Sequence, residues 1–337
     1  MTDGARRTPA VAYTHSGPID AADAFIDVEV EVPPPQPHDL LVEVRAVSVN
    51  PVDVKRRASS DPGGQPRVLG YDASGVVREV GAEVTAFAPG DAVFYAGSIA
   101  RPGTNAHLHL VDERIVGHKP ASLDFAEAAA LPLTTITAWE ALFDQLALSR
   151  DSRGVLLVMG ASGGVGSMVV QLAHRLTGLT VIGTASRPES IAWAREMGAN
   201  EVVHPRDLVS GVRRVAPDGV DHVFSPFSAG NSQAYAELLK PRGAVVAIDE
   251  PQDLDVLALK PKSQTWHWEF MFSRPLHEPE STYQRELLDS VARLIDDGVL
   301  RTTLTKRLRP LNAETLTEAH REVERSASIG KLVLEVG

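Results

Sequence analysis

Small residues in the middle of the chain have the spacing of a nucleotide-binding turn. The stretch GVLLVMGASGGVGSMVVQLA (154–173) places Ala161-x-Gly163-x-x-Gly166 between an apolar run typical of a strand and a second run with helical spacing. A tight turn of this kind lets a pyrophosphate approach the backbone, and the free N–H groups of the helix then face the phosphates. The alternative is a tight structural turn without a ligand, but the strand, helix and following strand supply the context that a dinucleotide site needs. The predicted cofactor-binding residues of this turn are Ala161, Ser162, Gly163, Gly164, Val165 and Gly166.

The end of the next predicted strand indicates which dinucleotide is bound. An NAD-binding protein would carry Asp or Glu here, to bond the ribose hydroxyls. The strand TVIGTA instead ends in Ser186-Arg187-Pro188. A hydroxyl can donate to a phosphate and a guanidinium can grip it with two bonds, so we predict that Ser186 and Arg187 bind the 2′-phosphate of NADPH. Alternatively, Ser186 caps a helix beginning at Pro188 and Arg187 points into solvent.

Composition narrows the classes of function. The chain has 337 residues, of which 43% are hydrophobic and 23% charged, and 33 Lys and Arg against 44 Asp and Glu give a net charge of −11. This balance argues against a nucleic-acid partner, which would need a basic face. There is no cysteine, so disulfides, thiolate catalysis and cysteine-ligated zinc are excluded. The N-terminal region lacks a signal-peptide core and no apolar run is long enough for a membrane span, so we expect a cytoplasmic protein with no membrane partner.

The pattern of hydrophobic residues changes along the chain. The first third reads as short strands, at 28–32, 40–49, 70–80, 91–95 and 107–116, separated by Gly and Pro as in a barrel or sandwich. Helical spacing begins at 124–131 and 137–148. From 155 strands alternate with helices, which predicts a parallel sheet covered on both faces. Two helical stretches, 281–296 and 312–326, and a strand at 332–336 end the chain.

These motifs resemble the medium-chain dehydrogenase/reductase family. The resemblance is carried by NPVD (50–53), GYDASGVV (70–77), Gly81-x-x-Val84-x-x-Phe87-x-x-Gly90-Asp91-x-Val93, EAAALPLTTITAWEAL (127–142), the glycine turn, HWEFMF (267–272) and GKLVL (330–334). Within the family the chain is similar to the zinc-independent quinone oxidoreductases, especially the bacterial branch often named zinc-type alcohol dehydrogenase-like proteins or NADPH:quinone reductases.

The resemblance implies an α/β fold with two domains. A GroES-like β-barrel catalytic domain would consist of residues 1–133 and be completed by residues 276–337, and a Rossmann nucleotide-binding domain would span residues 134–275. The active site would lie in the cleft between them. Family members usually form dimers through the edge strand of the nucleotide domain, so we expect a homodimer with AVVAI (244–248) as that strand.

The same resemblance argues against a catalytic metal. Zinc-dependent relatives place a cysteine where Asn50 stands and a histidine where Tyr71 stands. A catalytic zinc needs three protein ligands, and Asn and Tyr are poor substitutes. His107 and His109 lie on one face of a predicted strand, but such pairs are more often surface residues than ligands. We therefore expect no metal site.

Without a Lewis acid, the substrate must accept hydride unaided. Quinones and α,β-unsaturated carbonyls qualify, because conjugation spreads the incoming charge. The resemblance implies that Asn50, Tyr71 and Thr137 lie near the nicotinamide, where Asn50 and Tyr71 could donate to the substrate oxygen. Each has a structural alternative: a strand-end turn for Asn50, a core aromatic for Tyr71 and a cap at the helix start for Thr137.

Other candidate residues end or follow strands in the second half of the chain. Phe224, Ile248 and Asp249 stand at the carboxyl edge of the predicted parallel sheet, where ligands bind, and we expect them to line the nicotinamide channel. Tyr95 and the aromatic stretch 266–272 could wall a substrate pocket, although core packing is the commoner role of such rings. Two rival functions stay open: an enoyl or alkenal double-bond reductase, and a non-catalytic NADPH-binding sensor.

Overall fold

The computed structural model describes residues 6–325 and 328–337. The chain divides into two compact units: unit 1 contains the residues up to Leu133 together with Phe272–Gly337, and unit 2 contains Thr134–Met271. Unit 2 is thus inserted between two parts of unit 1. Unit 1 contains two sheets and unit 2 contains one.

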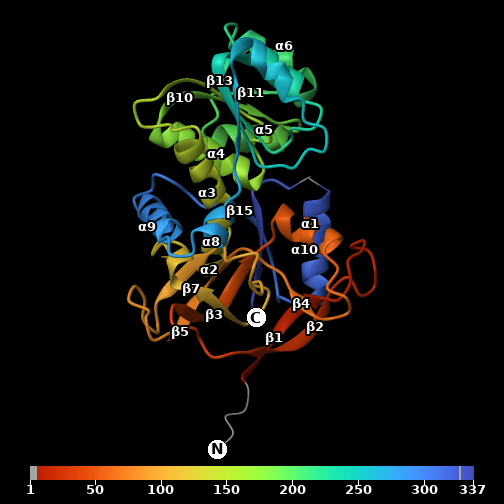
Figure 1. Cartoon of the computed structure of the whole chain (residues 1–337), viewed down its shortest axis with the longest axis vertical. Helices are drawn as coiled ribbons and strands as arrows, with labels where there is room; N and C mark the ends of the chain where they lie inside the picture. The colour runs from red at the N-terminus through yellow and green to blue at the C-terminus, as the bar shows by residue number, and fades with distance from the viewer. Residues whose placement is uncertain (1–5, 326–327) are drawn as a thin grey trace, which may run out of the picture. The chain divides into compact units, whose positions relative to one another are not determined.

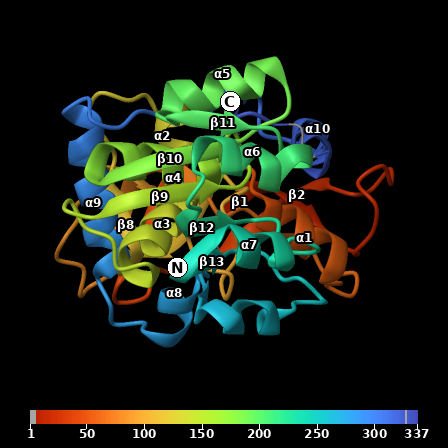
Figure 2. The same ribbon diagram turned by 90° about the horizontal axis from the view of Figure 1, so that it is seen from above.

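Unit 2 is a six-stranded parallel sheet with helices on both faces. Its strands are β9 (Arg153–Val158), β10 (Gly178–Thr184), β11 (Glu201–Val203), β12 (Val220–Ser225), β13 (Leu239–Ala247) and β14 (Thr265–Trp268). Its helical segments are α3 (Pro132–Trp139, which begins in unit 1), the π-helical η2 (Glu140–Gln145), α4 (Gly164–Leu176), α5 (Pro188–Met197), η3 (Pro205–Asp207), α6 (Leu208–Val215), α7 (Ser232–Leu238) and η4 (Val256–Lys262). The strand order is β11-β10-β9-β12-β13-β14, which Figure 2 shows for its first five members.

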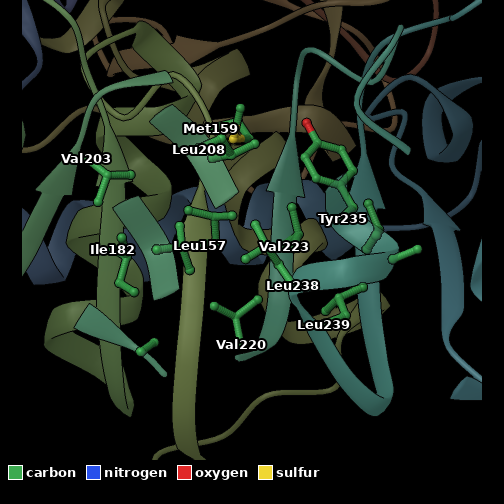
Figure 3. Close-up of a cluster of buried hydrophobic side chains, with 14 of the residues drawn as sticks. Leu157, Met159, Ile182, Val203, Leu208, Val220, Val223, Tyr235, Leu238 and Leu239 are labelled. Atoms are coloured by element: carbon green, nitrogen blue, oxygen red, sulfur yellow. The ribbon is translucent and has the colours of Figure 1, made fainter. Parts of the chain in front are cut away.

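The core of unit 2 follows from alternation along these strands. Leu157, Ile182 and Val223 lie on neighbouring strands and face the same side of the sheet, where they pack with residues of α6 and α7 (Figure 3). Helix α4 connects β9 to β10 and helix α5 connects β10 to β11, so these connections run across the sheet in the direction opposite to that from β12 to β13. Because such crossovers are right-handed, α4 and α5 cover the opposite face of the sheet. A sheet covered on both faces requires nearly continuous apolar strands, as the sequence of β9 shows.

Unit 1 is built mainly from antiparallel strands (Figure 1). Its strands are β1 (Arg6–Tyr13), β2 (Ile26–Val32), β3 (Asp39–Ser48), β4 (Arg67–Val68), β5 (Ala73–Val80), β6 (Ala92–Tyr95), β7 (Leu108–Asp112), β8 (Val116–His118), β15 (Leu304–Leu308) and β16 (Lys331–Glu335). Its helical segments are α1 (Pro51–Ser59), η1 (Glu113–Ile115), α2 (Phe125–Ala129), α8 (Ser273–His277), α9 (Tyr283–Asp296) and α10 (Ala313–Glu324). One sheet has the order β2-β1-β4 and the other β15-β16-β3-β5-β6-β8, with β7 also paired to β3.

The last strand of the chain completes this unit. Strand β16 pairs antiparallel with β3, with Val333 opposite Ser48. Ala46 of β3 and Val333 of β16 share a small apolar core with α2. Segments almost 300 residues apart in the sequence are therefore neighbours in one sheet, as the family resemblance implies.

Several predicted elements differ from the observed ones. The predicted strand 107–116 is wrong in extent: it begins at Leu108 and is interrupted by η1, because Asp112 caps a turn with its side chain accepting from the Arg114 N–H. Strand β1 and helix α1 were not predicted. The predicted helix 124–131 ends at Ala129, and α3 begins at Pro132. Residue 326, the predicted end of the last helix, lies outside the described residues.

The prediction that residues 244–248 form the edge strand is also wrong. Strand β14 pairs with β13, with Val245 opposite Trp266, and β14 therefore forms that edge of the sheet. Strand β14 was not predicted, because its aromatic residues were interpreted as the wall of a pocket or as core residues. Within the described residues, no helix has the length and apolar character needed to cross a membrane.

Candidate functional site

Unit 1 contains a buried cluster of charged and polar side chains. Asn50 follows β3 and is the N-cap of α1, Asp72 directly precedes β5, and Lys331 is the first residue of β16. Strand β3 lies between β5 and β16, so the sheet brings these three positions together. All three side chains are almost completely buried.

Hydrogen bonds join the cluster into a continuous network. The Lys331 ammonium donates to the Asn50 Oδ1 at 2.6 Å and to the Val49 carbonyl at 2.8 Å, and it lies 3.4 Å from the Asp72 Oδ2. The Asn50 Nδ2 donates to the same Asp72 oxygen at 2.7 Å. The other Asp72 oxygen accepts from the Leu133 N–H at 2.8 Å. Asn50 is therefore held at both ends of its amide, which leaves one N–H of its Nδ2 group for another acceptor.

Hydrogen bonding indicates which groups carry charge. Burial raises the pKa of Asp72 and lowers that of Lys331, while the opposite charge of each partner counteracts the shift. Asp72 receives three donors and Lys331 meets three acceptors, so we assign a carboxylate and an ammonium.

Asp53, on the first turn of α1, differs from Asp72. One of its oxygens accepts from the Asn50 N–H at 2.7 Å, and Oδ1 has no partner among the described residues. Burial raises the pKa of Asp53 to about 7, although Lys331 and this hydrogen bond counteract the shift. Near neutral pH, Asp53 is thus divided between its protonated and charged forms.

Tyr71 precedes Asp72, and its hydroxyl has no hydrogen-bond partner among the residues that the structure describes. Its ring packs edge-on against Phe272, with 5.3 Å between the ring centroids. Burial raises the pKa of Tyr71 to about 12, so the hydroxyl stays protonated at neutral pH. Within residues 6–325 and 328–337 it makes no hydrogen bond, and it is not among the fully enclosed polar atoms that lack one. Tyr71 therefore contributes a ring to the core of unit 1 and keeps a donor available.

The environment of Asn50 does not fit a catalytic zinc. The ammonium of Lys331, already bound to the Asn50 carbonyl oxygen, would repel a divalent cation placed beside it. Among the described residues, no group of three or more His, Asp or Glu side chains is positioned to hold a metal ion.

The two histidines of the predicted strand do not form a pair. His107 lies before β7, outside the strand. His109 is not a surface residue, contrary to the expectation: it is buried, its Nδ1 lies 3.1 Å from the Tyr95 hydroxyl and its Nε2 lies 3.0 Å from the Pro102 carbonyl. Burial lowers the pKa of His109 to about 4, so the ring is neutral and Nε2–H donates to Pro102 while Nδ1 accepts from Tyr95. Tyr95 is fully buried beside His109, which agrees with the core-packing alternative.

In unit 2 the glycine turn has the geometry that a dinucleotide requires. A Cβ at Gly166 would lie 2.1 Å from the Gly160 carbonyl oxygen, so glycine is needed there for helix α4 to pack against the turn. A Cβ at Gly163 would meet only that same oxygen, at 3.5 Å. The chain itself therefore does not require glycine at 163, and the space beside it suits an approaching phosphate.

Helix α4 directs unsatisfied backbone donors into this space. It begins at Gly164, with Gly163 as N-cap and no side-chain cap. The first backbone N–H with an intrahelical partner is that of Ser167, which donates to the Gly163 carbonyl. The N–H groups of Gly164, Val165 and Gly166 are the open donors expected at a helix start, and the positive end of the helix dipole adds to their field.

The corner after β10 is exposed, and Ser186 does not cap the helix that follows it, contrary to the alternative considered from the sequence. Ser186 and Arg187 both lie on the surface. The N-cap of α5 is Arg187, not Ser186, and the backbone N–H of Arg187 donates to the Ser190 hydroxyl at 3.0 Å. Ser190 does the capping, so the Ser186 hydroxyl is not used for it.

The remaining predicted residues occupy varied positions. Phe224 lies in β12 and is fully buried, and Ile248 follows β13 and is partly exposed. Asp249 accepts from the backbone N–H and the hydroxyl of Ser228, each at 2.6 Å, so its carboxylate fixes the loop after β12. Thr137 is buried in the last turn of α3, not at a helix start, which removes the capping alternative.

Three functional candidates were missed: Asp53, Asp72 and Lys331. Each belongs to a motif quoted for the family resemblance, but none was assigned a role. The signal was present in VSVNPVDV, LGYDASGVV and GKLVLEV, because a charged residue beside an apolar run needs a partner if it is buried. The sequence could not show that these charges face each other.

Comparison with known proteins assigns both units. The family model for the alcohol dehydrogenase GroES-like domain matches residues 36–135, and the model for zinc-binding dehydrogenases matches residues 164–268. Unit 1 is thus a GroES-like domain and unit 2 a Rossmann-type parallel sheet.

Individual relatives extend over most of the chain. A zinc-type alcohol dehydrogenase-like protein of Staphylococcus aureus (strain MSSA476) is 42% identical over 94% of this chain and 97% of its own. The NADPH-dependent alkenal/one oxidoreductase of Arabidopsis thaliana chloroplasts is 32% identical over 71% of this chain and 62% of its own. A crystal structure of a protein from Rhizobium etli CFN 42, described as a zinc-dependent alcohol dehydrogenase protein, is 47% identical, covers 98% of this chain and 99% of its own, and superimposes with a TM-score of 0.94.

Proposed function

Because the chain belongs to the medium-chain dehydrogenase/reductase superfamily, as a zinc-type alcohol dehydrogenase-like protein, we propose that it transfers hydride from NADPH to quinones or related conjugated carbonyls without a metal. The superfamily makes it an oxidoreductase that uses NADH or NADPH. The choice of cofactor, the substrate and the independence from metal are the proposal.

The observation that carries the proposal is the open turn at Gly163. Glycine is not needed there for packing, yet the backbone donors of α4 surround the position. Preference for NADPH is supported by the exposed Ser186 and Arg187, where a carboxylate would favour NADH. The name of the Arabidopsis relative, which specifies NADPH, agrees with this choice.

The proposed mechanism assigns one donor role to each of two side chains. NADPH supplies the hydride when bound. The Tyr71 hydroxyl and the second N–H of Asn50 then stabilise the negative charge that develops on the substrate oxygen. Lys331 and Asp72 hold the Asn50 amide in one orientation, so this donor needs no reorganisation during the reaction.

Metal independence is supported by the same network. The lysine ammonium provides the positive charge beside Asn50, at the position where zinc-dependent relatives have a cysteine ligand. A conjugated acceptor spreads the incoming charge over several atoms and has less need for a Lewis acid than a simple ketone has.

A substrate panel tests this proposal. Purified protein is mixed with NADPH and with quinones, enals, enones or simple ketones, with and without a chelator. We expect NADPH oxidation with conjugated acceptors and an unchanged rate after chelation. Loss of activity with EDTA and its recovery with zinc would contradict metal independence, and activity with simple ketones alone would contradict the substrate class.

A second candidate is reduction of an alkenal or enone carbon–carbon double bond. The observation that favours it is the 32% identity to the alkenal/one oxidoreductase. Product analysis separates the two: a saturated aldehyde or ketone identifies double-bond reduction, and a hydroquinone identifies quinone reduction. A chain that binds NADPH but oxidises it with no acceptor would instead be a non-catalytic sensor.

We also propose that the protein forms a homodimer through β14. This strand is an edge of the unit 2 sheet, and its last residue, Trp268, and the nearby Phe270 are about half exposed. An unpaired edge flanked by exposed aromatic residues favours association with another strand. Light scattering tests this: we expect a dimer for the wild type and a monomer for Trp268→Asp.

A further inference from the structure

An exposed aromatic residue lies at the point where the order in which the chain adds strands to the unit 2 sheet reverses. From β9 the chain proceeds to β10 and β11 on one side, and then returns to β12 on the other side. In open parallel sheets, ligands bind beyond the carboxyl ends of the strands at this switch point. The glycine turn follows β9, and residues 226–231, defined here as the β12 loop, follow β12. The two segments are neighbours, since the Met159 N–H donates to the Phe224 carbonyl at 3.0 Å.

Phe227, at the tip of the β12 loop, lies against the glycine turn. Its Cε2 is 2.9 Å from the position that a Cβ at Gly160 would take. Even so, 53% of the residue is exposed. One edge of the ring thus lies close to the turn, while about half of the residue is accessible to a ligand.

The backbone of the β12 loop is fixed by a buried polar network. The Phe227 N–H donates to the Ser225 hydroxyl at 3.2 Å, and its carbonyl accepts from the Tyr235 hydroxyl and from Asn231, each at 2.8 Å. Asp249 holds Ser228 through the two bonds described above. Figure 3 shows the Tyr235 ring within the apolar core, with its hydroxyl turned toward the carboxyl ends of the strands.

This arrangement is unusual for a surface loop. Ser225, Ser228 and Tyr235 are almost fully buried, so their hydroxyls are committed to holding the loop in one conformation. Satisfied buried networks of this kind rigidify the structure around them. The loop therefore keeps an apolar ring in water at a fixed position, which favours binding of an apolar or aromatic group there.

We propose that Phe227 is a cofactor-binding residue that packs against the nicotinamide–ribose half of NADPH, an inference that rests on the proposed binding of NADPH. The exposed corner after β10 suits the adenosine half and the glycine turn suits the pyrophosphate. The other half of the dinucleotide then extends to the β12 side of the switch point, where Phe227 lies.

Binding measurements with a full and a truncated ligand test this inference. Calorimetry gives the Kd of NADPH and of adenosine 2′,5′-bisphosphate, which lacks the nicotinamide half, for the wild type and for Phe227→Ala. Because about half of the phenyl surface would be covered, we expect NADPH to bind roughly tenfold more weakly to Phe227→Ala. The Kd of the truncated ligand should change less than about twofold.

Two further variants control the experiment. Phe227→Tyr keeps the ring and should retain the affinity for NADPH. Leu257→Ala removes an exposed apolar side chain of the same unit from η4 and should leave both Kd values unchanged. Thermal unfolding checks that each variant is folded.

The outcomes separate this inference from the proposed function. The inference is overturned, while NADPH binding stands, if the wild type binds NADPH and Phe227→Ala binds it equally well. The same holds if Phe227→Ala raises the Kd of both ligands by the same factor. If Phe227→Ala instead changes the oligomeric state, Phe227 belongs to an interface between copies and the inference fails. A wild type that binds neither ligand overturns the proposed function and this inference together.

Discussion

The two units prepare their sites in opposite ways. Unit 1 buries a lysine, a carboxylate and an amide in a closed network around Asn50, where each polar group has a partner within the chain. Unit 2 leaves backbone N–H groups and the Phe227 ring open at the carboxyl ends of its strands. The first arrangement fixes a donor in one orientation before any ligand arrives. The second leaves surface that a ligand completes. We therefore expect mutations in the first network to act mainly on stability, and mutations at the second site to act mainly on binding.

The largest effect is expected from Lys331→Met. The variant leaves the Asp72 carboxylate buried without its cation and should lower the free energy of unfolding by about 3–5 kcal/mol, as measured by urea denaturation. The matched control is Lys306→Met, which removes a partly exposed lysine paired with Glu318 and Glu322 and should cost under about 1 kcal/mol. Adding Asp72→Asn to Lys331→Met should recover part of the loss. Equal costs for Lys331→Met and Lys306→Met would show that the buried network does not contribute as described.

The next effect is a pH dependence from Asp53. Its ordinary pKa of 3.8 applies to the unfolded chain, and burial raises the pKa to about 7 in the folded protein. Between these values the folded state holds a proton that the unfolded state has released, so the free energy of unfolding falls as the pH rises from 4 to 7, by up to about 4 kcal/mol. Above pH 7 both states are ionised and this contribution is constant.

Asp53→Asn tests that dependence. It should remove this decline, because the amide oxygen can still accept from Asn50 but cannot ionise. Asp23→Asn, which changes an exposed carboxylate, should leave the decline in place. Urea unfolding at a series of pH values measures both, and an unchanged slope in Asp53→Asn would disprove the assignment.

Two glycines of the turn should separate packing from binding. Gly166→Ala places a Cβ against the Gly160 carbonyl and should cost about 1–3 kcal/mol of stability as well as NADPH affinity. Gly163→Ala should leave stability within about 0.5 kcal/mol and weaken NADPH at least tenfold, since its Cβ would occupy the space for the phosphate. Thermal unfolding and calorimetry give the two quantities. If Gly163→Ala bound NADPH as the wild type does, the pyrophosphate would not lie at this turn.

The smallest effect is expected from Arg187→Ala. Loss of one charge-assisted contact to the 2′-phosphate should weaken NADPH by about tenfold and leave the Kd of NADH unchanged. Arg206→Ala, at a surface position in η3, is the control. Tighter binding of NADH than NADPH by the wild type, or an unchanged NADPH affinity in Arg187→Ala, would count against the proposed cofactor.

Local patterns in the sequence were sufficient to predict the elements that neighbouring residues determine. The glycine spacing after β9 and the alternation of strands and helices predicted the parallel sheet, because these features depend on neighbouring residues. Strand β14 and helix α1 were missed for the same reason. Aromatic residues in β14 and charged residues in α1 do not show the hydrophobic periodicity of a strand or helix. The start of α1 has a local signal, the Asn50 cap followed by Pro51 and Asp53, which was interpreted only as the end of a strand.

By itself, the sequence determined that cysteine chemistry is excluded and that a glycine turn joins a strand to a helix. Only the tertiary structure decided that Asn50, Asp72 and Lys331 meet, because their pairing depends on β16 lying beside β3 across almost the whole length of the chain. It also decided that Phe227, rather than Phe224, is the exposed ring at the switch point, since the direction of a side chain after a strand depends on how its loop is hydrogen-bonded.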